Sequence, residues 1–282
     1  GVSIEDFQLD PLVRAIDMAR VNLLIADDVG IGKTIEALMV ARELLDRGEI
    51  TRTCVLCPPY LCEQWEHELW DKFRIRAVVI RSGTVARLER DLPSGQHSIF
   101  GYYPHIVVSI DYAKSDTHRA NFLQHAPHFV IVDEAHGATD LPAAGRDQQQ
   151  RHELLHSLAG APNRHLLLLT ATPHSGIEDA FLSLLGLLRP EFRQWRMAAL
   201  DDSQRATLAR HFVQRRRADV KAWLGEETPF PDRLSEEQTY SLSPAHSQLF
   251  EQTYSFCRDL FRRVSAQPLD RTSRFRQRVS YW

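Results

Sequence analysis

The stretch VNLLIADDVGIGKT, residues 21–34, decides the fold class of this chain. Its first six residues are mainly apolar and have the length of a buried strand, and the remaining eight form a turn with two glycines. From Thr34 to Arg47 apolar residues recur at helical spacing, and Gly48 stands where such a helix would end. A strand, a glycine-containing turn and a helix in this order are typical of a parallel α/β sheet.

The same alternation of strands and helices continues along the chain. The apolar run Arg52–Cys57 precedes a predicted helix over Leu61–Phe73, which places Trp65 and Trp70 on one side. The further runs typical of buried strands are Ala77–Ile80, His105–Ile110, His128–Val132 and His165–Leu169. We therefore predict a parallel sheet flanked by helices, with the polar segment Asp140–Gln150 as a surface loop.

The turn after the first strand has the composition of a phosphate-binding loop. Glycines let backbone N–H groups approach phosphate oxygens, and the N-terminus of the next helix adds the positive end of its dipole. In such loops a lysine, here Lys33, reaches the β- and γ-phosphates, and a hydroxyl, here that of Thr34, holds Mg²⁺. The usual pattern has glycine six residues before the lysine, where this chain has Asp27. The loop residues that we expect to bind ATP are Asp28, Gly30, Ile31, Gly32, Lys33 and Thr34.

Two carboxylates follow a second buried strand, in the sequence Asp133-Glu134-Ala135-His136. In parallel sheets, ligands bind beyond the carboxyl ends of the strands, so these side chains should face the phosphate loop. We expect Asp133 to hold Mg²⁺ through water and Glu134 to orient and deprotonate the attacking water. With Glu134 in that role, we expect His136 to bridge to the loop after the last strand.

That last strand, His165–Leu169, ends in Thr170-Ala171-Thr172-Pro173. The two hydroxyls could contact both the acidic turn and a nucleic-acid phosphate. Alone, this segment would equally suit a capped turn between a strand and a loop.

Taken together and in this order, the motifs resemble those of the SWI/SNF-type ATPases of helicase superfamily two. That family has an acidic residue where other phosphate loops have glycine, as Asp27 does here, and Thr-Ala-Thr-Pro after the last strand. The resemblance implies a RecA-like first motor lobe that uses ATP and Mg²⁺ as a DNA-dependent ATPase. The segment Phe7-Gln8-Leu9 looks like the family's adenine-reading segment, which would make Gln8 the adenine contact.

The resemblance also implies a nucleic-acid groove and a lobe junction. Cys57-Pro58-Pro59 with Trp65 is similar to a family motif that lines the groove, which assigns Pro58 to it, and Ser109-Ile110-Asp111-Tyr112 is similar to the next groove motif. With His136, Thr170 and Thr172, these residues form the expected nucleic-acid and coupling set. The segment Phe212–Val220 resembles the family's junction sequence, although Gln214 replaces its first arginine.

Composition changes after Pro190, where a mostly helical stretch to about Arg217 precedes a Gly/Pro-rich bridge, a strand-like segment Glu237–Leu242 and a helix from about Pro244. We predict lobe 1 over residues 1–216, a linker over 217–232 and the start of a second lobe over 233–282. The family's second lobe supplies arginines to the γ-phosphate from a Gln-x-x-Gly-Arg-x-x-Arg segment, and no such segment precedes Trp282. We therefore expect the 282-residue chain alone to hydrolyse ATP hardly at all.

Other metal or redox chemistry is disfavoured by spacing. Cys54 and Cys57 lie three apart on a predicted strand and point to opposite faces, so they cannot share a metal. The run His152-Glu153-Leu154-Leu155-His156 has the letters of a zinc-protease motif, but its leucines suit packing on the sheet and no third ligand is evident. Buried, reduced cysteines and the lack of a leader or a long apolar run favour a cytoplasmic protein without a membrane segment.

The function implied by this resemblance is ATP-driven translocation on double-stranded DNA without strand separation. The net charge of −3 does not oppose it, because a motor needs a basic stripe and not a basic total. Two alternatives stay open: a strand-separating RNA or DNA helicase of another superfamily-two branch, and a non-catalytic nucleotide-gated scaffold. Thr172-Pro173-His174-Ser175-Gly176 favours the bacterial branch, with partners in transcription or in a phage-defence system, where this chain would be the helicase-like subunit.

Overall fold

The computed structural model describes residues 4–96, 98–141, 145–173, 177–224, 236 and 239–266. The chain divides into two compact units, Gly1–Phe230 and Pro231–Trp282. In the described part of the second unit, one long helix, α12 (Pro244–Ala266), begins where the sequence predicts it. Among the described residues, no helix has the length and apolar character of a membrane span.

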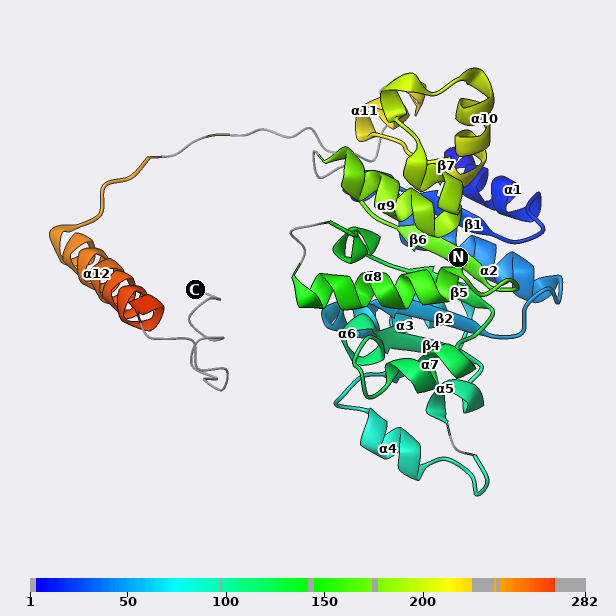
Figure 1. The fold of residues 1–282 in the computed structure, drawn as a ribbon, viewed down its shortest axis with the longest axis horizontal. Helices are drawn as coiled ribbons and strands as arrows, with labels where there is room; N and C mark the ends of the chain where they lie inside the picture. The colour runs from blue at the N-terminus through cyan, green and yellow to red at the C-terminus, as the bar shows by residue number, and fades with distance from the viewer. Residues whose placement is uncertain are drawn as a thin grey trace. The chain divides into compact units, whose positions relative to one another are not determined.

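The first unit contains a seven-stranded parallel sheet (Figure 1). The strand order is β3-β4-β2-β5-β6-β1-β7. The strands are β1 (Asn22–Ile25), β2 (Thr53–Cys57), β3 (Val78–Ile80), β4 (His105–Ser109), β5 (Phe129–Val132), β6 (His165–Leu169) and β7 (Phe212–Val213). The first six strands match the predicted apolar runs to within one or two residues at each end, which confirms the predicted fold class.

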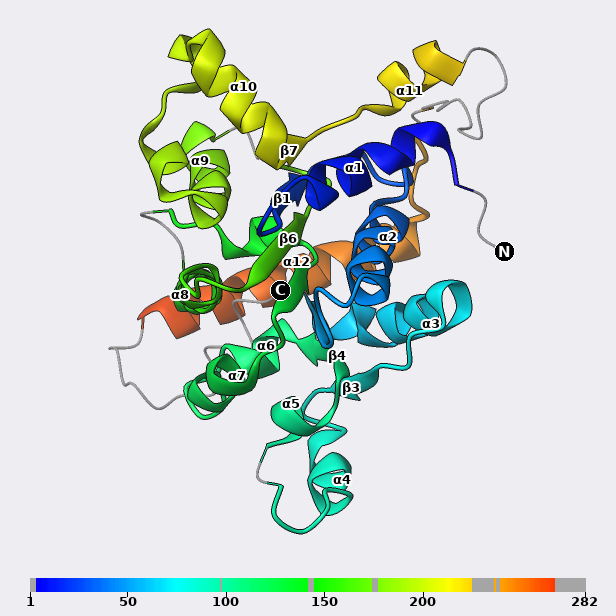
Figure 2. The ribbon, with the colours of Figure 1, turned by 90° about the vertical axis from the view of Figure 1, so that its right-hand side faces the viewer.

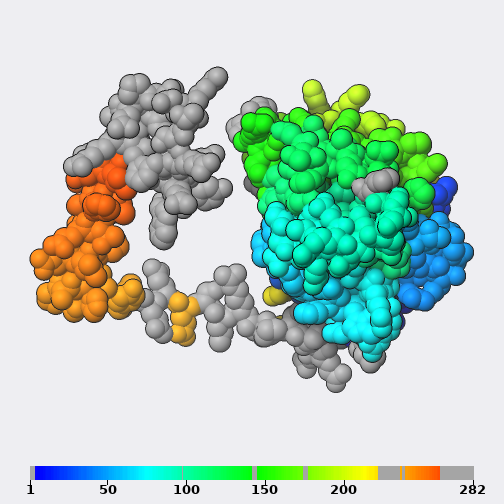
Figure 3. Space-filling view, turned by 90° about the horizontal axis from the view of Figure 1, so that it is seen from below, coloured from blue at the N-terminus to red at the C-terminus, as the bar shows by residue number. Residues whose placement is uncertain are grey.

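Helices cover both faces of the sheet (Figure 2). The α-helices of the first unit are α1 (Asp10–Ile16), α2 (Lys33–Asp46), α3 (Cys62–Phe73), α4 (Val85–Arg90), α5 (Ile99–Tyr102), α6 (Ile110–Ala113), α7 (Arg119–His125), α8 (Arg146–Ala159), α9 (Glu178–Leu188), α10 (Asp202–His211) and α11 (Arg217–Leu224). Short 3-10 helices are η1 (Asp6–Leu9), η2 (Pro59–Leu61), η3 (Ala135–Ala138), η4 (Pro190–Gln194) and η5 (Met197–Ala199). In the view from below, the atoms coloured cyan to green, from the middle of the chain, lie side by side on the face of this unit that is turned to the viewer (Figure 3).

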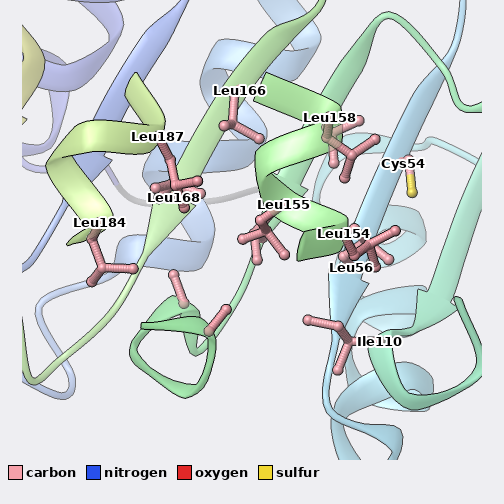
Figure 4. Close-up of a cluster of buried hydrophobic side chains, with 14 of the residues drawn as sticks. Cys54, Leu56, Ile110, Leu154, Leu155, Leu158, Leu166, Leu168, Leu184 and Leu187 are labelled. Carbon is pink, nitrogen blue, oxygen red and sulfur yellow. The ribbon is translucent and has the colours of Figure 1, made fainter. Parts of the chain in front are cut away.

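The alternation of side chains along each strand divides the core into two layers. Leu24 of β1 and Leu56 of β2 belong to the cluster beneath α8 and α9, where leucines dominate (Figure 4). Leu23 and Val55, their sequence neighbours, belong to the other cluster, beneath α2 and α3. Because both faces are buried, the strands are continuous apolar runs and show no polar alternation, as parallel sheets require.

Two expectations about secondary structure are wrong, and a third is confirmed except at one short strand. Residues 146–150 are not loop but the first turns of α8, where Arg and Gln are good helix formers and the Asp147 carboxylate pairs with Arg151 at 3.0 Å; residues 142–144 lie outside the described part. The stretch predicted as mostly helical to about Arg217 does contain η4, η5 and α10, but it ends in the short strand β7, whose β-forming Phe212 and Val213 pair with β1. Residues 239–242 contain no strand, since the described part of their unit offers no strand to pair with.

The linker predicted over Arg217–Asp232 begins with the helix α11, and residues 225–232 lie outside the described part. The boundaries of the two lobes therefore stay predictions.

Candidate ATP-binding and nucleic-acid site

The predicted site residues gather at the carboxyl edge of the sheet. The phosphate loop follows β1, the acidic turn follows β5 and Thr170 follows β6, which lies between these two strands in the sheet. Pro58 and Ser109 end the neighbouring strands β2 and β4, which pair as Cys57 with Ser109. Parallel strands all place their carboxyl ends at one edge, so residues spread over the sequence meet there.

The phosphate loop contains two glycines with left-handed backbone angles. Gly30 has φ of +87° and Gly32 has φ of +118°, values that L side chains rarely adopt. The ammonium of Lys33 donates to the backbone carbonyls of Asp27, at 2.7 Å, and Asp28, at 3.3 Å. Burial lowers the pKa of Lys33, and the carboxylates of Asp27, Asp133, Glu134 and Glu36 oppose that shift. The lysine therefore lies within electrostatic reach of the acidic turn, where a γ-phosphate and its metal would lie.

Gln8 packs directly on this loop. Its side-chain amide donates to the carbonyl of Ile31 at 2.9 Å, and its Oε1 accepts from the backbone N–H of Glu5 at 3.1 Å. Gln8 is buried and so is Ile31. The structure thus brings Gln8 to the phosphate loop. The contact of Gln8 with adenine stays a prediction.

Gly32→Ala is expected to weaken ATP binding strongly. A β-carbon on Gly32 would lie 2.2 Å from the amide nitrogen of Gln8, on a backbone with φ of +118°. Strain of this kind costs about 1–3 kcal/mol, and its relief by rearrangement of the loop would lower affinity about 5–150-fold. Titration with a fluorescent ATP analogue measures this effect.

Gly48→Ala is the matched control, because Gly48 also has positive φ, +72°, but no atom within 4 Å of the added carbon. Gly48 lies beyond the C-terminal end of α2. Gly48→Ala should therefore lower stability without changing ATP affinity. Equal ATP affinity in wild type and Gly32→Ala would show that this loop does not bind the nucleotide.

The acidic turn presents two carboxylates in different environments. Asp133 accepts at both oxygens: Oδ1 from the backbone N–H of Glu134 at 2.8 Å and Oδ2 from the indole N–H of Trp65 at 2.9 Å. Glu134 is half-buried and has φ of +50°, an uncommon backbone conformation for a residue with a side chain. A hydrogen bond from His136, and then electrostatic interactions with His136 and Lys33, lower the pKa of Glu134 despite its partial burial. Glu134 is therefore ionised at neutral pH, as a base must be.

His136 joins the acidic turn to the segment after β6. Its Nδ1 lies 3.2 Å from Oε2 of Glu134 and 3.2 Å from the hydroxyl of Thr170. That hydroxyl also accepts from the backbone N–H of Thr172 at 3.1 Å. These contacts match the bridging position predicted for His136; residues 174–176, which continue this segment, lie outside the described part.

A buried ionic cluster under the phosphate loop is a feature that sequence patterns did not indicate. The guanidinium of Arg215 pairs with the carboxylates of Asp27 and, at 2.6 Å, of Glu36, and both carboxylates are fully buried. Burial, then the charge of Asp27, raises the pKa of Glu36 to about 8, so one proton is retained between the two carboxyls at neutral pH. Asp27 is the acidic residue that stands where the usual pattern has glycine, and Arg215 is its structural partner.

The segment that carries Arg215 runs along the phosphate loop. The backbone N–H of Arg215 donates to Oδ1 of Asp27 at 2.7 Å, and the backbone N–H of Arg217 donates to Asp28 at 3.0 Å. Two further backbone bonds join Ala26 to Val213 and Asp28 to Arg215. The segment from Val213 to Arg217 is therefore attached to the loop that would hold the phosphates.

The cysteines and the histidine pair adopt the arrangement expected of packing residues. Cys54 and Cys57 belong to opposite layers of the core, which confirms that they face opposite sides of β2. Cys57 instead lies near Cys62, with the sulfurs 3.7 Å apart, a contact that spacing alone did not suggest. On α8, Nδ1 of His152 lies 3.0 Å from the carbonyl of Ala138, and the three leucines of the helix pack on the sheet. No cluster of three metal-ligating side chains exists among the described residues.

The parallel sheet with helices on both faces has the architecture of a RecA-like lobe. The sequence profile of the SNF2-related domain matches residues 9–261, most of the chain. The chain therefore belongs to the SNF2-related domain family.

Curated relatives in bacteria are about one third identical to this chain over the region that matches. It is 31% identical over 183 residues to the uncharacterized ATP-dependent helicase YqhH of Bacillus subtilis, covering 65% of this chain and 29% of that protein. It is 32% identical over 175 residues to the RNA polymerase-associated protein RapA of Erwinia tasmaniensis, covering 60% of this chain and 17% of that protein. The matched region is thus less than a third of either relative.

Solved structures share the fold at low sequence identity. The SWI2/SNF2 ATPase core of Sulfolobus solfataricus in complex with dsDNA superimposes with a TM-score of 0.60 at 18% identity, covering 99% of this chain and 56% of that chain. A second structure, of the Sulfolobus solfataricus SWI2/SNF2 ATPase core domain, superimposes with a TM-score of 0.56 at 16% identity, covering 92% of this chain and 52% of that chain. This likeness supports the RecA-like fold assignment.

Proposed function

We propose that this chain is the ATP-binding lobe of a motor that hydrolyses ATP and moves along double-stranded DNA. The observation that carries the proposal is the meeting of Lys33, Asp133 and Glu134 at one edge of the sheet, with Glu134 linked through His136 to Thr170. Membership of the SNF2-related family supports the activity. The double-stranded track is supported by the Sulfolobus core, whose structure contains dsDNA.

Each side chain has a chemical part in this proposal. Lys33 would leave the loop carbonyls to bind the β- and γ-phosphates, while the Thr34 hydroxyl and Asp133 would hold Mg²⁺, which neutralises phosphate charge when bound. Glu134, ionised at neutral pH, would orient the attacking water and take its proton. The backbone of Asp28, Gly30, Ile31 and Gly32 would surround the phosphates, with Gln8 at the adenine.

The path from ATP to nucleic acid would run through the neighbouring strand ends. Thr170 and Thr172 connect to Glu134 through His136, and Pro58 and Ser109 end the next strands along the same edge. A track formed by the phosphate backbone predicts binding that is largely independent of base sequence and weakens as salt rises.

Two other functions can be tested with the same protein. The description of YqhH as an ATP-dependent helicase favours strand separation as the second candidate, and a strand-displacement assay separates the two. A nucleotide-gated scaffold would bind ATP without turnover. The RNA polymerase association named for RapA supports a partner in transcription, while a role in phage defence stays a prediction.

The test is the ATPase rate with and without duplex DNA, on a chain that includes a complete second lobe. We expect duplex DNA to stimulate turnover more than single-stranded DNA or RNA does. ATP binding with no turnover under any condition would replace the motor by the scaffold. Residues 1–282 alone should turn over slowly, because arginines from a second lobe contribute about 10³–10⁵ in rate in such enzymes.

A further inference from the structure

The buried indole of Trp65 contacts a carboxylate at the candidate magnesium site. Trp65 lies on α3, only 2% exposed, and its Nε1–H donates to Oδ2 of Asp133 at 2.9 Å. Sequence resemblance placed this tryptophan in a motif that lines the nucleic-acid groove. The structure instead directs its polar atom towards the acidic turn after β5.

Two hydrogen bonds fix the orientation of the Asp133 carboxylate. Oδ2 accepts from Trp65 and Oδ1 from the backbone N–H of Glu134 at 2.8 Å, so rotation of the carboxylate would break both. Each oxygen keeps a second lone pair, which remains available to a metal ion or its water. The Asp133 backbone is fixed as well, because its N–H donates to the carbonyl of Leu56 at 2.8 Å.

The chemical nature of the donor also matters. An arginine or lysine in this position would neutralise Asp133 and compete with a cation, whereas the indole N–H is a donor without charge. The indole therefore orients the carboxylate and leaves its negative charge to the metal. Burial of the ring in the core cluster that also contains Cys57, Cys62 and Leu69 restricts its own movement.

We infer that Trp65 is a positioning residue that orients Asp133 for Mg²⁺. The inference rests on the proposed function, because it requires that Asp133 serve an ATP-bound magnesium ion. Residues that orient metal-binding side chains in this way change metal affinity or activity about 10–100-fold when replaced.

The experiment compares Trp65→Phe with Trp70→Phe in the full-length protein. Trp70 lies on the same helix, but its ring is partly exposed. The guanidinium carbons of Arg74 and Arg76 lie 5.3 and 4.8 Å from the centre of that ring. The first readout is the Mg²⁺ concentration that gives half of the maximal DNA-stimulated ATPase rate. We expect it to rise at least about tenfold in Trp65→Phe and to stay at the wild-type value in Trp70→Phe.

The second readout does not need turnover. It is the rise in melting temperature when Mg²⁺ is added to protein saturated with ATP in EDTA, measured within each variant, so that a change in intrinsic stability cancels. We expect this rise to be smaller in Trp65→Phe than in wild type and unchanged in Trp70→Phe. If Trp65→Phe does not fold, incorporation of benzothienylalanine at position 65 keeps the shape of the ring and removes only the N–H.

The outcomes separate this inference from the function on which it rests. A wild-type protein with no Mg²⁺-dependent stabilisation by ATP would overturn the proposed function and the inference with it. Wild-type stabilisation that Trp65→Phe, or the benzothienylalanine variant, reproduces fully would overturn the inference alone and leave the indole as a packing residue.

Discussion

Glu134→Gln is expected to lower DNA-stimulated ATP turnover about 10²–10⁴-fold while ATP still binds. Glutamine has the shape of glutamate but cannot take a proton from water at neutral pH. The wild-type carboxylate can, because it is ionised at neutral pH, and its hydrogen bond with His136 keeps it in that form by lowering its pKa. The measurements are phosphate release at saturating ATP with duplex DNA, and titration with a fluorescent ATP analogue.

The matched control for this prediction is Glu89→Gln, since Glu89 is an exposed carboxylate on α4, outside the phosphate loop and the acidic turn. It should leave both turnover and ATP binding unchanged. If Glu134→Gln retained turnover close to that of wild type, another group would have to activate the water. Loss of ATP binding together with turnover would instead indicate damage to the site as a whole.

Local patterns in the sequence were sufficient to predict the sheet and the position of the site. The apolar runs that became β1, β2, β5 and β6 are buried on both faces, so a short continuous run identifies each of them without help from distant residues. Because the site residues follow the ends of these strands, prediction of the strands also placed Lys33, Asp133 and Thr170 at one edge.

The other features of the fold and of the site could not be predicted, because they depend on pairing between distant segments. The two residues of β7 form a strand only because β1 offers an open edge, at a sequence separation of nearly two hundred residues. The hydrogen bond between Trp65 and Asp133 likewise joins residues 68 apart, with no pattern that links them. One signal was available for the ionic cluster: Glu36 is a charged residue within a helix whose neighbours are buried and apolar.

That ionic cluster leads to the prediction with the largest effect on stability, for Arg215→Met. Two fully buried carboxyls, those of Asp27 and Glu36, share the guanidinium of Arg215. Removal of one partner from a buried ion pair typically costs about 3–5 kcal/mol, because a charge is left buried without compensation. For a unit of this size we expect the melting temperature to fall by about 6–20 °C. Arg216→Met, a change at an exposed neighbour, is the matched control and should have little effect.

The pH dependence of this loss tests its cause. Burial raises the pKa of Asp27 and, to about 8, that of Glu36, although Arg215 lowers both values. A carboxyl with a raised folded-state pKa stabilises the fold below its unfolded pKa and loses that contribution as pH rises through the folded value. Without Arg215 both pKa values rise further, so the free energy of unfolding lost in Arg215→Met should grow as pH rises above the ordinary carboxyl range, and should continue to grow above about pH 8, the wild-type value for Glu36. Glu36→Gln in the same variant should recover part of the loss above about pH 8, where the Glu36 carboxyl would otherwise ionise without a partner. A loss that is equal across this range, and that Glu36→Gln does not reduce, would assign the effect of Arg215 to packing and not to its charge.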